Sequence, residues 1–388
     1  MSRFYSHVNT ATTIIKAYKG EVPLAVFIRN FFSKEKKYGS RDRRTISSLC
    51  YNYFRLGFAL EKSRIEERLI LSVFLGTDSS NEWLQNLRPQ WNEKINLPLA
   101  EKILITKFAP GNIFPFNAQL SDSIDIDLFN ASFLIQPDLF VRIRPGKHAA
   151  VKKKLSEAGI AYKEMDHNSL AFENSTKLEA VLEINREIVI QDLNSQRVGD
   201  LLLEGEYKKP TTVWDCCAAS GGKSIMTYDL LSNTQLTASD IRESIIKNLQ
   251  TRFREAGIKD SRTFVADITN PKSLQDAIKT TKFDLVICDA PCSGSGTWAR
   301  TPEQLLIFKK EEITRYSNLQ KSIAANSSLY VKKGGYFLYI TCSVFKKENE
   351  EVVEFIKAQT QFTLIESRLL IGYNEKADTM FAALFRVV

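Results

Sequence analysis

The sequence predicts an α/β protein built mainly on a doubly wound, mostly parallel β-sheet. From about residue 211 onward, short apolar runs typical of strands alternate with longer stretches of helical periodicity. In such a sheet the carboxyl ends of the strands lie along one edge, where ligands bind. A polar or reactive side chain stands at the end of five of these runs, namely Asp215, Asp240, Asp267, Asp289 and Cys342. We therefore expect one functional site along that edge.

Residues 1–135 are expected to form an N-terminal helical domain. Apolar residues recur there at spacings of three and four, and no run shows a clean period of two. Six basic residues cluster between positions 34 and 44. Such a basic cluster is either the solvated face of a helix or a surface that contacts RNA, and the sequence leaves both interpretations open. The six basic residues of the cluster are Lys34, Lys36, Lys37, Arg41, Arg43 and Arg44.

Residues 136–205 are expected to form a small α/β domain with a basic edge. That edge would hold the backbone of an RNA, or it would serve only solubility. The expected elements are strands at 139–145, 169–174 and 186–192 and a helix at 147–159 that ends at Gly159. The basic residues of the edge are Arg142, Arg144, Lys147, Lys152, Lys153 and Lys154.

Residues 206–388 are expected to form the large domain that contains the parallel sheet. Its strands are short and apolar, and the helices between them begin or end at glycine, serine or acidic residues. The expected strands lie at 211–217, 235–240, 262–267, 283–291 and 334–343, and the expected helices begin near 220 and cover 243–257 and 303–331.

Composition limits the class of protein. The chain has 388 residues, of which 44% are hydrophobic and 25% are charged, and these values are typical of globular domains. Its net charge of +8 favours a polyanionic partner. The three histidines are scattered and the six cysteines show no repeated CxxC spacing, so we expect no metal site. No signal-like segment or apolar run of 18 residues occurs, and we expect a cytoplasmic protein without membrane association.

The loop after the first strand of the large domain predicts a nucleotide-like ligand. Its two glycines allow close approach of the backbone, and the helix that follows offers free N–H groups. A phosphate-binding loop of the G-x-x-x-x-G-K-[ST] type is disfavoured because its first glycine would fall at Cys217. The carboxylate of Asp240 could accept hydrogen bonds from two ribose hydroxyls, and Asp267 could meet an adenine edge.

Two cysteines are expected to face one cleft. Cys292 follows the fourth strand in the segment DAPCSG, and Cys342 follows the fifth strand in the segment TCS. Because the fourth and fifth strands are expected to be neighbours, the two thiols can meet although 50 residues separate them. A buried structural role is the more common one for Cys50, Cys216 and Cys288.

These segments resemble the RNA cytosine-5 methyltransferases of the Nop/Sun family. The similarity lies in DCCAASGGK, ASDIRESIIKNLQ, FVAD, DLVICDAPCSGSGTWAR and GGYFLYITCSVFKKENEEVV, and it extends to QDLNSQRVGDLL at 191–202. The segment GSRDRRTISSLCYNYFR at 39–55 resembles the NusB-like helical domain of the bacterial Sun-type 16S ribosomal RNA enzyme. The resemblance implies a Rossmann-like, S-adenosylmethionine-dependent catalytic domain preceded by a small RNA-binding domain and a helical domain.

The resemblance also implies roles for individual residues. Cys342 matches the family's nucleophile, and Cys292 matches the cysteine that assists product release, although the reverse assignment stays open. Asp240 matches the ribose ligand and Asp267 the adenine ligand, while Asp289 would lie beside the methionine part of the cofactor and the target base. The cofactor loop falls on Cys217, Ala218, Ala219, Ser220, Gly221, Gly222 and Lys223, with Ser220 where the family usually has proline.

The implied reaction is methylation of carbon 5 of a cytosine in 16S ribosomal RNA through a covalent cysteine–cytosine adduct. Arg142, Arg144 and Lys147 would contact the RNA, and no obligate protein partner is expected. Transfer RNA is the alternative substrate, and a ribosome-assembly factor with incidental methylation is the alternative function. At the C-terminus, DTMFAALFRVV stands where the family usually has Asp-Gly-Phe-Phe.

Overall fold

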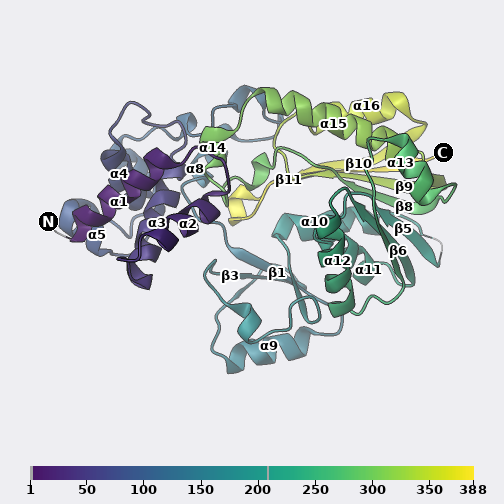
Figure 1. Cartoon of the computed structure of the whole chain (residues 1–388), viewed down its shortest axis with the longest axis horizontal. Coiled ribbons are helices and arrows are strands. Elements are labelled where there is room, and N and C mark those ends of the chain that lie inside the picture. The colour runs from purple at the N-terminus through teal and green to yellow at the C-terminus, as the bar shows by residue number, and fades with distance from the viewer. Residues whose placement is uncertain (1–2, 208) are drawn as a thin grey trace. The chain divides into compact units, whose positions relative to one another are not determined.

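The computed structural model describes residues 3–207 and 209–388, and its contacts divide the chain into two compact units (Figure 1). Unit 1 comprises Met1–Ala118, Ile124–Gln136 and Thr297–Lys310. Unit 2 comprises Gln119–Ser123, Pro137–Gly296 and Glu311–Val388. In the part of the chain that the structure describes, no helix is both long and apolar enough to span a membrane.

Unit 1 is helical, as expected for residues 1–135. Its longer helices bury apolar side chains, with Ile46 and Leu49 of α3 and Leu69 of α4 in the core. Asn81 and Asp125 cap the helices that follow them, since their side chains accept hydrogen bonds from Leu84 N and Leu128 N. The helices are α1 (Arg3–Ala17), α2 (Leu24–Lys34), α3 (Ser40–Arg55), α4 (Ile65–Gly76), α5 (Glu82–Leu87), α6 (Pro89–Asn92), α7 (Leu99–Thr106), α8 (Ile126–Ser132) and α14 (Gln304–Ile307).

The segment Thr297–Lys310 belongs to unit 1 although it lies far along the chain. The ring of Trp298 is 1% exposed and lies 5.7 Å from the ring of Phe114 and 4.8 Å from the ring of Phe308, measured between centroids. The guanidinium of Arg55 donates to Ala299 O at 2.9 Å, and burial lowers the pKa of Arg55 to about 10. Tertiary packing therefore fixes this segment in the helical unit.

This packing explains why the expected single helix at 303–331 is wrong. Two helices occur instead, α14 and α15 (Glu311–Ser328), and α15 lies in unit 2. Phe308 adopts an extended backbone with φ −69° and ψ 137° and places its ring against Trp298. A new helix then begins at Glu311 and Glu312, whose negative charges favour a helix N-terminus.

Unit 2 contains a seven-stranded sheet with the order β10-β11-β9-β8-β5-β6-β7 (Figure 1). The pairs from β9 to β7 are parallel, and β11 is antiparallel to both β9 and β10. This confirms the mostly parallel sheet, and the antiparallel edge is the part that the sequence did not predict. The strands are β5 (Thr211–Asp215), β6 (Thr234–Asp240), β7 (Ser261–Val265), β8 (Phe283–Asp289), β9 (Val331–Thr341), β10 (Phe362–Leu370) and β11 (Met380–Val387).

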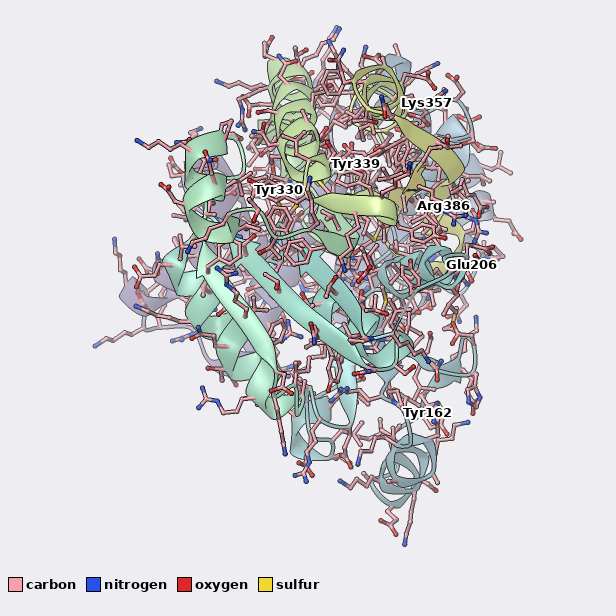
Figure 2. The ribbon with its side chains drawn as sticks, turned by 90° about the vertical axis from the view of Figure 1, so that its right-hand side faces the viewer. Tyr162, Glu206, Tyr330, Tyr339, Lys357 and Arg386 are labelled. Carbon is pink, nitrogen blue, oxygen red and sulfur yellow. The ribbon has the colours of Figure 1, made fainter. Side chains whose placement is uncertain are left out.

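Helices cover both faces of this sheet, so alternate strand residues are buried on opposite sides. On one face Leu285 and Ile287 of β8 join the core of α10 (Leu193–Leu203), α11 (Gly222–Leu230) and α12 (Glu243–Glu255). On the other face Val286 joins the core of α13 (Pro271–Ile278), α15 and α16 (Glu350–Gln359). Tyr339, labelled in Figure 2, is fully buried on this second face. Burial on both sides explains the near-continuous apolar runs of the central strands.

A smaller antiparallel sheet precedes the large one within unit 2. Val151 and Leu155 of the helix α9 (His148–Glu157) pack against Val141 and Leu170 of this sheet. The strand order is β2-β3-β1-β4, and the expected strands and helix of this region are confirmed. The proposed boundaries at 135/136 and 205/206 stay a prediction. The strands are β1 (Leu139–Ile143), β2 (Lys163–Glu164), β3 (Ser169–Phe172) and β4 (Ile188–Ile190).

Candidate active site

The ends of β8 and β9 bring two thiols into contact. These strands pair in parallel up to Asp289 and Ile340, so the turns that follow them lie side by side. The Sγ atoms of Cys292 and Cys342 are 3.2 Å apart, and both residues are partly exposed. The hydrogen bond with Cys342 and burial raise the pKa of the Cys292 thiol well above its ordinary value. The two thiols therefore lie together beyond the ends of neighbouring strands, and their shared cleft stays a prediction.

A carboxylate that sequence reasoning missed ties these two turns together. Glu348 accepts hydrogen bonds from Ser293 N at 2.9 Å and from Ser343 Oγ at 2.9 Å. The next residue, Asn349, donates to Ser343 O at 2.9 Å and accepts from Thr341 Oγ1 at 2.6 Å. Both residues belong to the KKENEEVV segment, whose run of polar residues before an apolar pair was the available signal.

The loop Cys217–Lys223 connects β5 to the N-terminus of α11. Gly221 has φ +82°, and a Cβ at this position would lie 2.3 Å from a methyl carbon of Leu249. Only glycine fits this conformation and spacing. Ala219 N donates to Asp240 Oδ2 at 3.2 Å, which ties the loop to the end of β6. The first turn of α11 leaves backbone N–H groups that can bind a polar ligand.

Asp240 and Asp267 are held in defined orientations at the ends of neighbouring strands. Asp240 Oδ1 accepts from Arg242 N at 2.9 Å and from Arg242 Nε at 3.0 Å, a pairing that the sequence analysis did not predict. Asp267 lies two residues beyond β7, and its Oδ1 accepts from the N and Oγ1 of Thr269. Hydrogen bonds thus hold both carboxylates at the same edge of the sheet, and Asp240 also contacts the loop that ends at Lys223.

Lys223 and Asp289 form an ion pair that links this loop to β8. Lys223 Nζ lies 3.4 Å from Asp289 Oδ2 and donates to Ser195 Oγ at 2.6 Å. The lysine is almost fully buried, whereas the side chain of Asp289 is 31% exposed. Asp289 therefore presents a fixed carboxylate at the site, three residues before Cys292.

Asp215, at the end of β5, is the most strongly perturbed carboxyl group near the site. It is fully buried, and burial raises its pKa to about 7. Its Oδ2 accepts from Ser224 Oγ at 2.6 Å, while Oδ1 has no hydrogen-bond partner among the described residues. The folded protein therefore holds this proton at a pH where the unfolded chain has released it.

We expect Asp215 to make the unfolding free energy fall as the pH rises from about 4 to about 7, the interval between its unfolded and folded pKa values. Asp215→Asn should remove this contribution, which amounts to about 2 kcal/mol between pH 5 and pH 7. Urea unfolding at pH 5 and pH 8 measures it, with the exposed Asp276→Asn as the control. Equal pH dependence in the wild type and Asp215→Asn would contradict the expectation.

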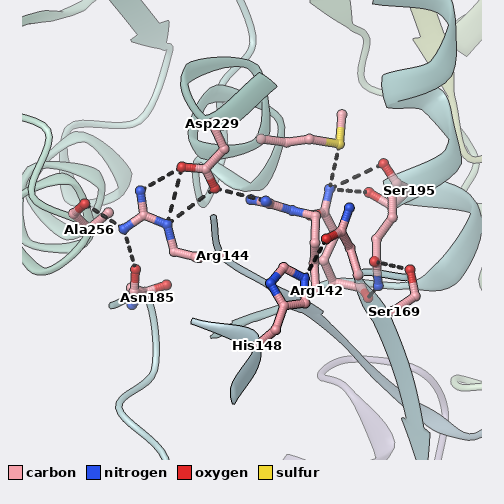
Figure 3. Close-up of polar contacts among 12 residues, drawn as sticks. Arg142, Arg144, His148, Ser169, Asn185, Ser195, Asp229 and Ala256 are labelled. Atoms are coloured by element: carbon pink, nitrogen blue, oxygen red, sulfur yellow. Dashed lines mark hydrogen bonds and ion pairs between the residues drawn. The ribbon is translucent and has the colours of Figure 1, made fainter. Parts of the chain in front are cut away.

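Two residues of the expected basic edge, Arg142 and Arg144, pair with an acidic side chain of the same unit (Figure 3). Arg142 Nη1 lies 2.8 Å from Asp229 Oδ2, and Arg144 Nη2 lies 2.6 Å from Asp229 Oδ1. Arg144 also donates to the carbonyl oxygen of Asn185 at 3.0 Å. One carboxylate of α11 thus holds both guanidinium groups, and the expected contacts of Arg142, Arg144 and Lys147 with RNA stay a prediction. Lys147 is half-buried at the start of α9.

Removing this carboxylate should destabilise unit 2 strongly. Asp229→Ala leaves two buried guanidinium groups without their partner, which costs about 3–5 kcal/mol. Glu157→Ala, which breaks the exposed pair with Lys153, should cost less than about 1 kcal/mol. Urea unfolding of both variants compares the two losses. Similar losses in the free energy of unfolding would show that the Asp229 ion pairs stabilise the protein no more than an exposed ion pair does.

The mostly parallel sheet of unit 2, with helices on both of its faces, is a Rossmann-like fold. Residues 202–383 match the family model described as 16S rRNA methyltransferase RsmB/F, which confirms the resemblance over this part of the chain. A probable ribosomal RNA small subunit methyltransferase B of Bacillus subtilis (strain 168) is 33% identical over 181 residues, 46% of this chain and 39% of the relative. Ribosomal RNA small subunit methyltransferase B of Proteus mirabilis (strain HI4320) is 25% identical over 64% of this chain and 59% of the relative. The matches thus span about 40–60% of the length of these relatives.

Solved structures share the fold at lower identity. The crystal structure of PH0851 matches with a TM-score of 0.71 and 21% identity, over 99% of both chains. A methyltransferase homolog protein from Pyrococcus horikoshii matches with a TM-score of 0.57 and 19% identity, over 70% of this chain and 92% of that chain. NSun6 from the same organism, determined with SFG, matches with a TM-score of 0.56 and 14% identity, over 65% of this chain and 91% of that chain.

Proposed function

We propose that the protein methylates carbon 5 of a cytosine in 16S ribosomal RNA, with S-adenosylmethionine as methyl donor. The observation that carries the proposal is the thiol pair of Cys292 and Cys342, 3.2 Å apart beside the loop that joins β5 to α11. A cytosine carbon 5 is a poor nucleophile until a thiolate adds to carbon 6 of the same ring. Two thiols at one site allow one to attack and the other to assist release.

The loop and the neighbouring carboxylates fit this cofactor. Gly221, whose positive φ and contact with Leu249 exclude a side chain, allows the tight turn that leads the loop into the first turn of α11. Asp240 would accept hydrogen bonds from the ribose hydroxyls, and Asp267 would lie at the adenine edge. The bound cofactor supplies a methyl group on a positively charged sulfur. Asp289, fixed by Lys223, would hold the methionine part and the target base beside it.

In the proposed reaction Cys342 forms the bond to the base. Its thiolate adds to carbon 6, carbon 5 then takes the methyl group, and a covalent cysteine–cytosine adduct results. Asp289 would hydrogen-bond the base and favour the shift of electrons toward carbon 5. Cys292, in contact with Cys342, would assist the loss of the carbon 5 proton and the break of the carbon–sulfur bond.

Ribosomal RNA as the substrate is supported by the relatives and by charge. The curated relatives are named ribosomal RNA small subunit methyltransferases, and the chain has a net charge of +8. A basic protein binds RNA in a salt-dependent manner. The cytosine would have to be single-stranded or flipped out of a helix to reach the thiols, at a cost of a few kcal/mol in the second case.

The test is transfer of labelled methyl groups from S-adenosylmethionine to unmodified small-subunit ribosomal RNA, followed by nucleoside analysis. Unmodified transfer RNA and assembled small-subunit particles are assayed in parallel. Label in 5-methylcytidine from ribosomal RNA, free or in particles, is the expected result. Label in transfer RNA alone would overturn the substrate, and label in another nucleoside would overturn the chemistry. The absence of label from all three would overturn the proposed activity.

A further inference from the structure

The backbone of Gly296 connects the Cys292 segment, residues 290–296, to Cys342. Gly296 N donates to Cys342 O at 2.9 Å, and Gly296 O accepts from Thr379 N at 3.0 Å. Cys342 directly follows β9, and Thr379 directly precedes β11, which pairs with β9. Gly296 therefore bonds the backbone on both of its sides, four residues after Cys292.

Position 296 has no room for a side chain. A Cβ on Gly296 would overlap the carbonyl oxygen of Thr379 and would lie 2.9 Å from the carbonyl carbon of the same residue. It would also lie 3.0 Å from Cys342 O. These neighbours are backbone atoms, which cannot turn aside as the end of a flexible side chain can. The φ of Gly296 lies outside the left-handed region, so space alone requires the glycine here.

The segment on the far side of this contact is held in place by buried groups. Thr379 is 1% exposed, and its Oγ1 accepts from Gly372 N at 3.2 Å. The side chain of Asn194, at the start of α10, is fully buried and donates to Asp378 O at 2.8 Å. A Cβ on Gly372 would overlap the same carbonyl oxygen. Asp378 and Thr379 thus lie packed between two glycines, and a side chain at position 296 has to displace the Cys292 segment.

The other contacts between the Cys292 segment and the chain after β9 depend on side chains. Ser295 Oγ accepts from Val344 N at 3.0 Å, and the carboxylate of Glu348 accepts from Ser293 N. Side chains can rotate and form such bonds again after a small shift of the backbone. The contact of Gly296 with Cys342 joins backbone to backbone, so it fixes the path of the segment directly.

We propose that Gly296 and Thr379 are positioning residues that hold the Cys292 segment against Cys342 and thereby set the distance between the two thiols. The proposal rests on the proposed function for its purpose, because one thiol has to reach the adduct that the other forms. It also gives a role to the segment that begins at Asp378, which departs from the family's usual Asp-Gly-Phe-Phe. Thr379 supplies a hydroxyl that a glycine would lack.

The test is the rate at which dibromobimane bridges Cys292 and Cys342. Each thiol displaces one bromide from this probe, which becomes fluorescent once both have reacted, and peptide mass spectrometry locates the bridge. Cys292→Ala gives the background from the other cysteines. The wild type should form the bridge because its two sulfurs are in contact. In Gly296→Ala the rate should fall at least about tenfold, because a small displacement removes the advantage of proximity.

Two glycine controls separate displacement of the thiols from loss of stability. Gly111→Ala adds a Cβ that lies 3.9 Å from Asp127 Oδ1, and it should change neither stability nor bridging. Gly57→Ala adds a Cβ that overlaps Ile113 O within unit 1, so it should lower the free energy of unfolding. Bridging in the folded Gly57→Ala protein should nevertheless equal that of the wild type. A fall in Gly57→Ala as large as that in Gly296→Ala would overturn the proposal.

Variants of Thr379 keep the proposal falsifiable if Gly296→Ala does not fold. Thr379→Val keeps the shape of the side chain but removes the acceptor for Gly372 N, and it should slow bridging at least about threefold. Thr379→Ser keeps the hydroxyl and should restore the wild-type rate. Wild-type bridging in Thr379→Val, or in a folded Gly296→Ala, would overturn the proposal.

The same variants connect the thiol distance to the proposed reaction. Gly296→Ala should lower single-turnover methyl transfer about 10²-fold, the usual effect of misplacing a reacting group by about 1 Å. Its affinity for S-adenosylmethionine, measured by equilibrium dialysis, should not change. Bridging requires neither RNA nor cofactor. A protein that bridges as expected but methylates no RNA would refute the proposed function and retain this inference, whereas wild-type bridging and methyl transfer in Gly296→Ala would do the reverse.

Discussion

Cys342→Ala is expected to abolish methyl transfer to RNA, with a loss of at least about 10³-fold in the single-turnover rate. Without the sulfur that adds to carbon 6, carbon 5 of cytosine cannot attack the methyl group. The thiol lies beside Cys292 just beyond the end of β9, and replacing it should not disturb the sheet because both residues lie outside the strands. Transfer of label into RNA in a single turnover measures the effect.

Cys50→Ala is the matched control for this loss. Cys50 is a buried cysteine of α3 in unit 1, and burial raises the pKa of its thiol to about 12, so it is not ionised at neutral pH. This variant should retain methyl transfer. Substantial transfer by Cys342→Ala would reject Cys342 as the nucleophile.

Cys292→Ala is expected to accumulate a covalent complex with RNA. Cys342 would still add to the base and the methyl group would still transfer, but the step that frees the product would lose its assisting thiol. The complex should survive denaturing gel electrophoresis as a band retarded by the mass of the RNA. Turnover should fall by about 10²-fold or more, the usual contribution of a positioned proton-transfer group.

The double variant and the single variants together assign the two roles. Cys292→Ala with Cys342→Ala should form no complex, because no thiol remains to add to the base. A complex in Cys342→Ala and none in Cys292→Ala would exchange the two roles and would make Cys292 the nucleophile.

The parallel sheet and the meeting of the two thiols could be predicted because they depend on local pattern and simple topology. The apolar runs of β5, β6 and β8 predict strands because these segments are buried on both faces of the sheet. Once β8 and β9 are neighbours, residues just beyond their ends must lie close together. The same reasoning placed Asp240 at the edge of the sheet, whereas its pairing with Arg242 depends on a turn whose geometry is not encoded in the pattern.

Contacts between residues far apart along the chain could not be predicted from the sequence pattern. Arg142 and Arg144 resemble a surface strip, but their partner Asp229 is 85 residues from Arg144 along the chain and reaches both through the packing of α11. Glu348 was missed because its role depends on two turns that only the folded chain brings together. The break between α14 and α15 likewise follows from tertiary burial of Trp298 and Phe308.

The route of the chain through unit 1 bears on how this protein can be dissected or recombined. Four residues after Cys292 the chain leaves unit 2, and it returns at Glu311. A fragment that begins at residue 137 would keep Trp298 and Phe308 but lose Phe114 and Phe116, whose rings bury them. The helical unit is therefore no detachable N-terminal module, and any exchange of that unit between relatives has to carry two separate stretches of sequence together.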